Sequence, residues 1–476
     1  MTAPLLATAS QSSLYMLVAD DPSRSTPSEW TGSTPDPGAA PDRLTLDTTR
    51  DEPLAYSHTS QKRAHWYQTS ALLVGEVMGT GVLSLPYAAA GLGWVLSAAA
   101  LIVFAFASTY AGVLLARVKN DFYPRGDSYA DMAYAISGTR FGLYTRCAII
   151  TGWAMLLPYF LIATADSLKI VFLADAEALC TWHWTLVVAA LLLPLLQLTT
   201  LTSISYLAWP SSAAILVAIV LVIVGFGSSG GGAQARGTTS VGLPAGSGFL
   251  ETYGHLASFV FAYQGQSMFL EMQAEMRDAR MFPKACRVAY GLISVVYSLT
   301  TGVAYGMQGS TVASFLPDSL GDGLLKRLVG VCLGFHILVA YVVTAQPLTA
   351  YIYSKAFPYT PKDAPTLAVR VRWLLVSSAY LTFAVLVANA IPFFSDLQEL
   401  IGAMTGAPII FGWPAFFYLS ACRQRGRAVA SVDLVLCGLS LFVCLPVFTL
   451  LGTASAIQTI ADDVGHLGGP FQCGRA

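Results

Sequence analysis

The chain has 476 residues, of which 55% are hydrophobic and only 11% are charged, and its formal net charge is −1. A soluble domain carries roughly 25% charged residues, so this composition excludes an ordinary soluble protein. The near-zero net charge gives no reason to expect a nucleic-acid partner. Apolar runs of about 20 residues recur along most of the chain, and they predict an all-α polytopic protein embedded in the lipid bilayer.

Residues 1–64 are rich in Ser, Thr, Pro and Asp and are expected to form a disordered cytosolic tail. A transmembrane domain is expected over residues 65–455, with an extracytosolic C-terminal tail at 456–476. The hydropathy pattern predicts eleven membrane spans, at about 69–91, 94–118, 143–172, 185–199, 205–226, 249–274, 285–310, 326–353, 370–390, 394–419 and 430–454.

A Gly/Ser-rich loop at residues 227–248 divides the transmembrane domain into two repeats, 65–226 and 249–420, and an eleventh helix follows at 430–455. Five spans in each block is an odd number. We therefore expect the two repeats to be inverted relative to each other in the membrane.

The distribution of basic residues predicts the orientation. Cytosolic ends of membrane spans carry an excess of Lys and Arg. With the N-terminus in the cytosol, eighteen basic residues near the spans fall inside, and five fall outside: Lys169, Arg236, Lys326, Arg327 and Arg475. Cys180 and Cys473 both fall on the predicted outer side, where a disulfide between them is possible. The other cysteines show no metal-ligand spacing.

The first span contains its own interruption. Gly79-Thr80-Gly81 lies at the middle of an apolar run, with Pro86 following it. Glycine costs the interior of a helix about 1 kcal/mol and proline about 3 kcal/mol, so the helix is expected to break here. A kinked span that packs closely through its glycines is the alternative explanation.

The sixth span is interrupted in the same way, with Tyr263-Gln264-Gly265-Gln266 between apolar turns. Spans 1 and 6 each open a five-span block, so the two breaks occupy matching positions. Such paired interruptions are the best indication in a sequence of a transporter's binding site near the bilayer midplane.

The chemistry of two facing breaks suits a zwitterion. The half-helix expected to start near Val82 directs free N–H groups at the gap, which favours a carboxylate. Carbonyl groups at the ends of the first half-helices favour an ammonium group or a small cation. We expect an α-amino acid to bind there, with contacts from Gly79, Thr80, Gly81, Tyr159, Tyr263, Gly265 and Gln266.

These residues also carry a family resemblance. The stretch from Glu76 to Tyr87, followed by Leu92-Gly93-Trp94, resembles the opening motif of the amino acid/auxin permease family, and Phe261–Gln273 resembles that family's sixth span. The resemblance implies the five-plus-five inverted-repeat fold of the amino acid–polyamine–organocation superfamily and amino acid transport, usually coupled to protons. Two positions depart from the plant-type branch: it typically has a small residue at Glu76 and often His at Gln266.

The ion-coupling candidates are polar residues within the spans. Intramembrane ionisable residues are functional by default, and Glu76 and Glu271 are the carboxylates closest to the breaks. Glu271 could instead be a solvated or Arg-paired anchor near the cytosolic end. A sodium site would need clustered oxygen ligands, but Thr344 in span 8 has Val343 and Ala345 beside it. The expected coupling ion is therefore H+, with Na+ the less favoured alternative and no other cofactor.

Other polar residues have ordinary structural explanations. His255 and His336 are expected to be satisfied core histidines. Asp396 and Glu399 are expected to complement the N-terminal dipole of span 10, and Asp166 is expected to pair with Lys169.

The sequence favours a secondary active amino acid transporter that works by alternating access. A receptor-like amino acid sensor on the same scaffold is the main alternative. An enzyme is disfavoured because the spans contain no nucleophile–base pair or metal motif. No feature requires an oligomer. The plasma membrane and the lysosomal or vacuolar membrane both remain open, as does the transported side chain.

Overall fold

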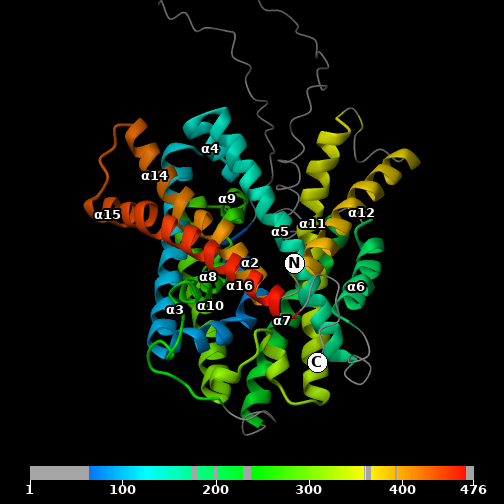
Figure 1. Ribbon diagram of the computed structural model, residues 1–476. Coiled ribbons are helices and arrows are strands. Elements are labelled where there is room, and N and C mark those ends of the chain that lie inside the picture. Colours follow the sequence, from blue (N-terminus) through cyan, green and yellow to red (C-terminus); the bar gives the residue numbers. More distant parts are fainter. Residues whose placement is uncertain are drawn as a thin grey trace, which may run out of the picture.

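The computed structural model describes residues 64–172, 180–197, 201–228, 237–358, 360, 366–391 and 394–467. These residues are helical almost throughout, and one isolated β-bridge joins Ala64 to Met276. Within the described ranges, eight helices are long and apolar enough to cross a membrane, and Thr181–Leu195 is a shorter apolar helix. The expectation of an all-α multi-pass membrane protein is confirmed (Figure 1).

The helices of the first half follow the predicted spans closely. They are α2 (Trp66–Val77), the 3-10 turn η1 (Thr80–Leu83), α3 (Leu85–Arg117), α4 (Tyr129–Ser137), α5 (Thr139–Val171), α6 (Thr181–Leu195) and α7 (Leu201–Ser228). The second half contains α8 (Phe249–Tyr263), η4 (Gln266–Met268), α9 (Phe269–Ala274), α10 (Phe282–Gln308), α11 (Leu324–Ala356) and α12 (Leu367–Ala390).

The remaining helices are interrupted by π-helical turns. They are α13 (Phe394–Ile401), α14 (Trp413–Gln424), α15 (Ser431–Leu439) and α16 (Gly452–Leu467). The last helix continues to Leu467, beyond the expected end of the transmembrane domain at residue 455; residues 453–464 contain neither Gly nor Pro. Only a small part of Ser431–Asp462 is buried, so this segment lies along the outside of the bundle (Figure 1).

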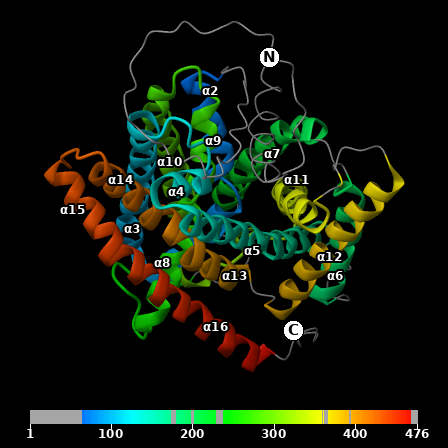
Figure 2. The same ribbon diagram turned by 90° about the horizontal axis from the view of Figure 1, so that it is seen from above.

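Two groups of helices stand on either side of α5. Helices α2, α3, α8, α9 and α10 pack together on one side, and α6, α11 and α12 lie on the other (Figure 2). Helix α5 packs against α6 and α11 of the second group, and α13, which packs against both α5 and α8, joins it to the first group.

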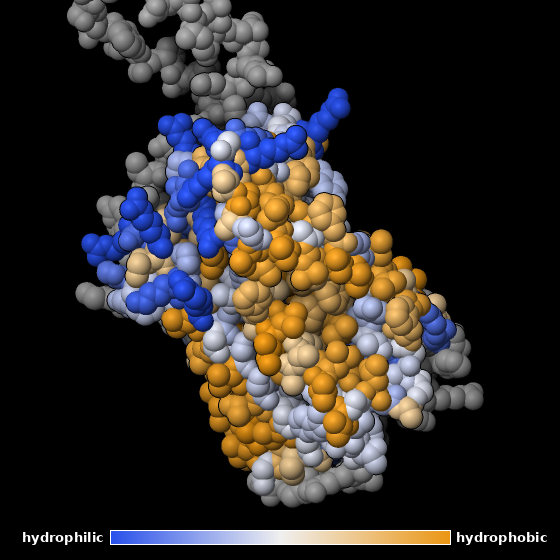
Figure 3. Space-filling model, turned by 90° about the vertical axis from the view of Figure 1, so that its left-hand side faces the viewer, coloured by the Kyte–Doolittle hydropathy of each residue, from blue (hydrophilic) through white to orange (hydrophobic). Residues whose placement is uncertain are grey.

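We define two faces at the ends of the bundle. The tail face holds Ala64, Asp121, Arg277 and Arg427, and hydrophilic residues gather at this end while an apolar band covers the middle (Figure 3). The opposite end is the loop face, where residues 237–243 cross the bundle. There Trp94 N donates to the Ser240 carbonyl at 3.0 Å.

The turn between the first and second spans lies at Gly93, as the sequence predicts. Its φ of 75° is a left-handed conformation that favours glycine. A β-carbon at this position would lie 2.0 Å from the carbonyl oxygen of Gly242. The backbone of the 237–243 segment therefore seals this turn on the loop face.

The start of the described chain is attached to the second broken helix. Ala64 N donates to the Glu275 carbonyl at 3.2 Å, and Arg277 N donates to the Ala64 carbonyl at 2.9 Å. Ala64 is 1% exposed. These two bonds fix the N-terminal segment at the end of α9 on the tail face, and we call this contact the N-terminal clasp.

Candidate functional site

The first predicted break is present, but the regular helix resumes later than expected. Helix α2 ends at Val77, the 3-10 turn η1 follows, and α3 begins at Leu85 rather than near Val82. Pro86 explains why the helix resumes at this position. Proline lacks an N–H group and fits the first turn of a helix, where that group has no partner.

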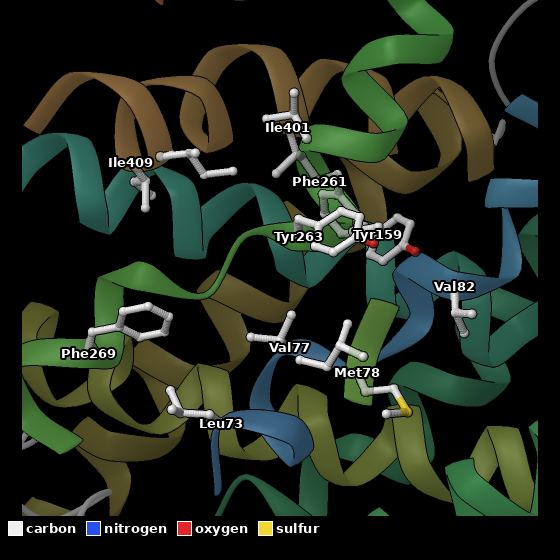
Figure 4. Close-up of a cluster of buried hydrophobic side chains, with 14 of the residues drawn as sticks. Leu73, Val77, Met78, Val82, Tyr159, Phe261, Tyr263, Phe269, Ile401 and Ile409 are labelled. Atoms are coloured by element: carbon white, nitrogen blue, oxygen red, sulfur yellow. The ribbon is translucent and has the colours of Figure 1, made fainter. Parts of the chain in front are cut away.

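The second predicted break is also present. Helix α8 ends at Tyr263, Gln264 is extended, and a short 3-10 turn leads from Gly265 into α9. Both helices are therefore interrupted, and the prediction from the sequence is confirmed for each. Figure 4 shows Tyr159, Phe261 and Tyr263 clustered beside the interrupted chain.

The two breaks are in direct contact with each other. A β-carbon on Gly81 would lie 2.8 Å from Cα of Ala262, and a β-carbon on Gly265 would lie 2.5 Å from a methyl group of Val77. Because real β-carbons do not approach other atoms so closely, both positions need glycine. The glycines at the breaks therefore have a packing role at these two positions.

Gly79 is different, because a β-carbon built on it would have no neighbouring atom within 4 Å. The next two residues, Thr80 and Gly81, are the first of the 3-10 turn, and no side chain caps that turn. Their N–H groups donate to none of the described residues. Free amides beside open space form a suitable cradle for an anionic group.

The carbonyl groups at the breaks are bonded by the protein itself, which modifies the expectation that they are free. The Tyr297 hydroxyl lies 3.0 Å from the Val77 carbonyl and 2.9 Å from the Ala262 carbonyl. The Tyr263 carbonyl accepts from Ser108 and Tyr290, each at 3.1 Å. One hydroxyl has one proton, so Tyr297 satisfies one carbonyl at a time.

Sequence reasoning missed Tyr290 and Tyr297 as parts of the site. Both are fully buried on α10. Their spacing of seven residues places them on one face of the helix. That spacing is the signal that could have identified them, but it is also typical of an ordinary packed helix.

Tyr159 lies at the junction of several elements. Its hydroxyl donates to Gln398 Oε1 at 3.0 Å, and Thr80 is a second polar neighbour of that hydroxyl. Its ring packs against Phe261 and Phe394. The amide of Gln398 also donates to the Ser84 hydroxyl. This hydrogen-bonded group links α5 and α13 to the first break.

Tyr263 and Gln266 are less available to a ligand than the sequence suggests. The Tyr263 hydroxyl donates to Ser294 on α10 at 3.3 Å. The Gln266 side chain is fully buried, donates to the Tyr263 carbonyl at 3.3 Å and accepts from Gly265 N at 3.0 Å. Gln266 therefore holds the second break in shape.

Glu76 has an unusual environment for a carboxylate. It is exposed at the surface of the described chain, although it lies within a predicted membrane span. Within the described part of the chain, no hydrogen bond or ion pair reaches it. It is the second-last residue of α2, four positions before Thr80 in the sequence.

Glu271 is buried, and its Oε2 has no hydrogen-bond partner among the described residues. The cation that interacts with it is Lys119, itself 4% exposed, rather than an arginine. Lys119 donates to the Leu270 carbonyl at 3.2 Å and pairs with Asp127. Glu271 is thus part of a buried charged cluster at the tail face.

Thr344 lies on α11, which packs against α5 and α7. Its hydroxyl makes no hydrogen bond with any described residue, and its neighbours Val343 and Ala345 are apolar. Asp166 and Lys169 form the expected ion pair at 2.8 Å. His336 contacts Ser211 and is buried, as a core histidine would be.

The fold that these elements form also occurs in a solved structure. The chain superposes on MhsT, solved in complex with L-phenylalanine, with a TM-score of 0.51 over 82% of this chain and 98% of that one, at 12% identity. The molecule is thus a helical membrane protein that shares the fold of MhsT, with two interrupted helices in contact.

The sequence pattern of the family described as "Transmembrane amino acid transporter protein" matches residues 62–458, and the chain belongs to this family. Among its relatives is "Amino acid transporter AVT1H" of Arabidopsis thaliana, 26% identical over 74% of this chain and 80% of that protein. Another is "N amino acid transport system protein" of Neurospora crassa, 25% identical over 87% of this chain and 89% of that protein. The family resemblance noted from the motifs is confirmed.

Proposed function

We propose that this protein is a proton-coupled secondary transporter of amino acids that binds its substrate between the two breaks. The observation that carries the proposal is the pair of free amides at Thr80 and Gly81 beside the open space at Gly79. They suit the carboxylate that every α-amino acid carries. Family membership and the names of the relatives support an amino acid as the substrate.

The ammonium group of the substrate would compete with Tyr297 for the carbonyls of Val77 and Ala262. A cation makes stronger hydrogen bonds than a neutral hydroxyl does. The Tyr297 hydroxyl can bond to either the Val77 or the Ala262 carbonyl. When it bonds to one of them, the other is available to the substrate and Tyr297 keeps a hydrogen-bond partner. The zwitterion is thereby recognised at both ends by backbone groups.

Alternating access would move one helix group past the other. We assign the eleven spans to two inverted repeats of five and one additional helix, with α2, α3, α8, α9 and α10 rocking against α5, α6, α11 and α12. The packing of these helices into two groups supports this assignment. Tyr159 and Gln398 would connect the groups at the substrate.

We place the tail face in the cytosol, because the basic residues favour that side. A disulfide at Cys180, on the other side, supports this orientation, since disulfides persist in oxidising compartments. Cys473, the partner considered in the sequence analysis, lies outside the described residues. Either the plasma membrane or the lysosomal or vacuolar membrane fits this orientation.

Proteoliposomes test the function directly. A panel of labelled L-amino acids, including L-phenylalanine, is offered with and without an imposed pH gradient, and external sodium is replaced by choline in a parallel set. We expect at least one amino acid to accumulate when the loop face is acidic, and sodium replacement to have no effect. A response to sodium alone would reverse the assignment of the ion. Failure of every amino acid to enter would contradict the transport function.

A second candidate function is an amino acid sensor that signals through its N-terminal segment. The N-terminal clasp favours it, because the clasp ties that segment to the end of α9. A chain that lacks residues 1–63 keeps Ala64 and the clasp. We expect it to transport at the rate of the full chain, whereas a pure sensor would show no flux in either form.

A further inference from the structure

A histidine and two glutamates form a polar cluster between the loop face and the breaks. His255 of α8 lies between Glu251, on the same helix, and Glu399 of α13. Its Nε2 is 3.8 Å from Glu251 Oε1, and its Nδ1 is 3.4 Å from Glu399 Oε1. His255 is 7% exposed and Glu399 is 4% exposed, whereas the Glu251 side chain is 57% exposed.

Glycines on neighbouring helices make room for these side chains. A β-carbon on Gly91 of α3 would lie 2.1 Å from the imidazole of His255. One on Gly254 would lie 2.4 Å from Glu399 Oε2. The imidazole and the carboxylate therefore rest directly on the backbones of neighbouring turns, where larger residues would displace them.

The surroundings supply no other cation. The segments packed against α8 are α3, α13, α16, η1 and the π-turns at 402–406 and 447–451. Their described titratable groups near the cluster are Tyr87, Asp396 and Glu399, with Tyr87 in edge contact with the imidazole. Their one Lys or Arg within the described ranges, Arg117, is at the tail-face end of α3 and pairs with Asp433.

This arrangement differs from that of an ordinary core histidine. Nδ1 of His255 is buried and makes no hydrogen bond with correct geometry to any described residue. A buried carboxylate is costly unless a cation or a proton neutralises it. Among the described neighbours, protonated His255 is the cation that can pair with Glu399, because the others are neutral or acidic.

We propose that His255, with Glu251 and Glu399, is a proton-binding site reached from the loop face. Glu251 offers the exposed end, and its Oε2 accepts from Gly248 N at 3.0 Å, which fixes the carboxylate beside the imidazole. A bound proton converts His255 to an imidazolium paired with the Glu399 carboxylate. When it leaves, that carboxylate loses its countercharge, so the proton favours contact between α8 and α13.

The site is connected to the substrate through the neighbour of Glu399. Gln398 bonds both Tyr159 and Ser84, at the first break. A shift of α13 relative to α8 would therefore disturb the group that surrounds the substrate. This inference rests on the proposed transport function, and it predicts which face's pH controls the transport rate.

The test compares His255→Gln and Glu399→Gln with the wild type in proteoliposomes, with His336→Gln as the matched control. His336 is also a buried histidine, but its contacts are with Ser211 rather than with a carboxylate. The probe is the labelled amino acid that enters most rapidly in the panel. Two rates are measured at loop-face pH values from about 5 to about 8: uptake driven by the pH gradient, and counterflow exchange without a gradient.

We expect His255→Gln and Glu399→Gln to reduce gradient-driven uptake roughly tenfold or more, to remove its dependence on loop-face pH and to preserve counterflow. His336→Gln should match the wild type. Wild-type pH dependence in His255→Gln would overturn the proposal. Loss of counterflow in both cluster variants would also overturn it, because the cluster would then be structural.

If the wild type transports at a rate that does not depend on the pH gradient, the proposed proton coupling is contradicted, but the proposed transport function is not. The site is then judged by counterflow alone. An altered pH profile of counterflow in His255→Gln would support the site, and an unchanged profile would overturn it.

Discussion

Gly79→Val should abolish amino acid uptake while the protein continues to fold. The β-carbon of the new side chain enters open space, so no packed atom has to move to admit it. The valine would nevertheless stand before the free amides of Thr80 and Gly81. Two hydrogen bonds to a charged group are worth about 1.5–3 kcal/mol each, so their loss reduces affinity about a hundredfold or more.

Gly81→Ala is the matched comparison. Its added methyl group would lie 2.8 Å from Cα of Ala262, so the two breaks would have to separate. We expect a lower melting temperature and a lower yield of folded protein for Gly81→Ala, and wild-type values for Gly79→Val. Normal uptake by folded Gly79→Val would exclude the amide cradle as the carboxylate site.

Glu76→Gln should remove the pH dependence of uptake and leave exchange intact. Each coupled proton adds about 1.4 kcal/mol, or about tenfold in accumulation, per unit of pH gradient. With the wild type, accumulation should therefore rise as the loop face becomes more acidic than the tail face. The variant keeps the shape of the side chain but cannot receive a proton that the His255 cluster has bound, so its accumulation should stay constant across the same gradients.

Glu271→Gln distinguishes the two carboxylates that the sequence nominates. Glu271 lies beside Lys119 in a charged cluster, whereas no described residue bonds to Glu76. We expect Glu271→Gln to retain the response to the pH gradient. A flat profile in Glu271→Gln together with a normal one in Glu76→Gln would assign the coupling to the tail-face cluster instead.

The breaks could be predicted from the sequence because their causes are local. Gly79, Gly81 and Pro86 each disfavour a regular helix wherever the rest of the chain lies. The start of α3 at Leu85 also has a local cause, Pro86, although the expected start near Val82 was wrong. The turn at Gly93 has the same origin.

The partners of the broken ends could not be predicted in this way. Tyr297 and Ser108 reach the carbonyls from other helices, and in sequence they look like ordinary buried residues. The same is true of His255 and Glu399, which are far apart in the chain but share a cluster. Gln266 shows the converse, since its position at a break suggested a ligand contact and its amide bonds to the break itself.

The N-terminal clasp has a mechanical consequence. Any outward swing of α9 must either carry Ala64 with it or break two backbone hydrogen bonds. A partner protein that pulls on the preceding residues from the tail face would therefore transmit force to this helix without entering the bundle. A protein bound to the segment that ends at Ala64 could therefore slow or restore transport from outside the membrane. Such regulation requires no second ligand-binding pocket within the bundle.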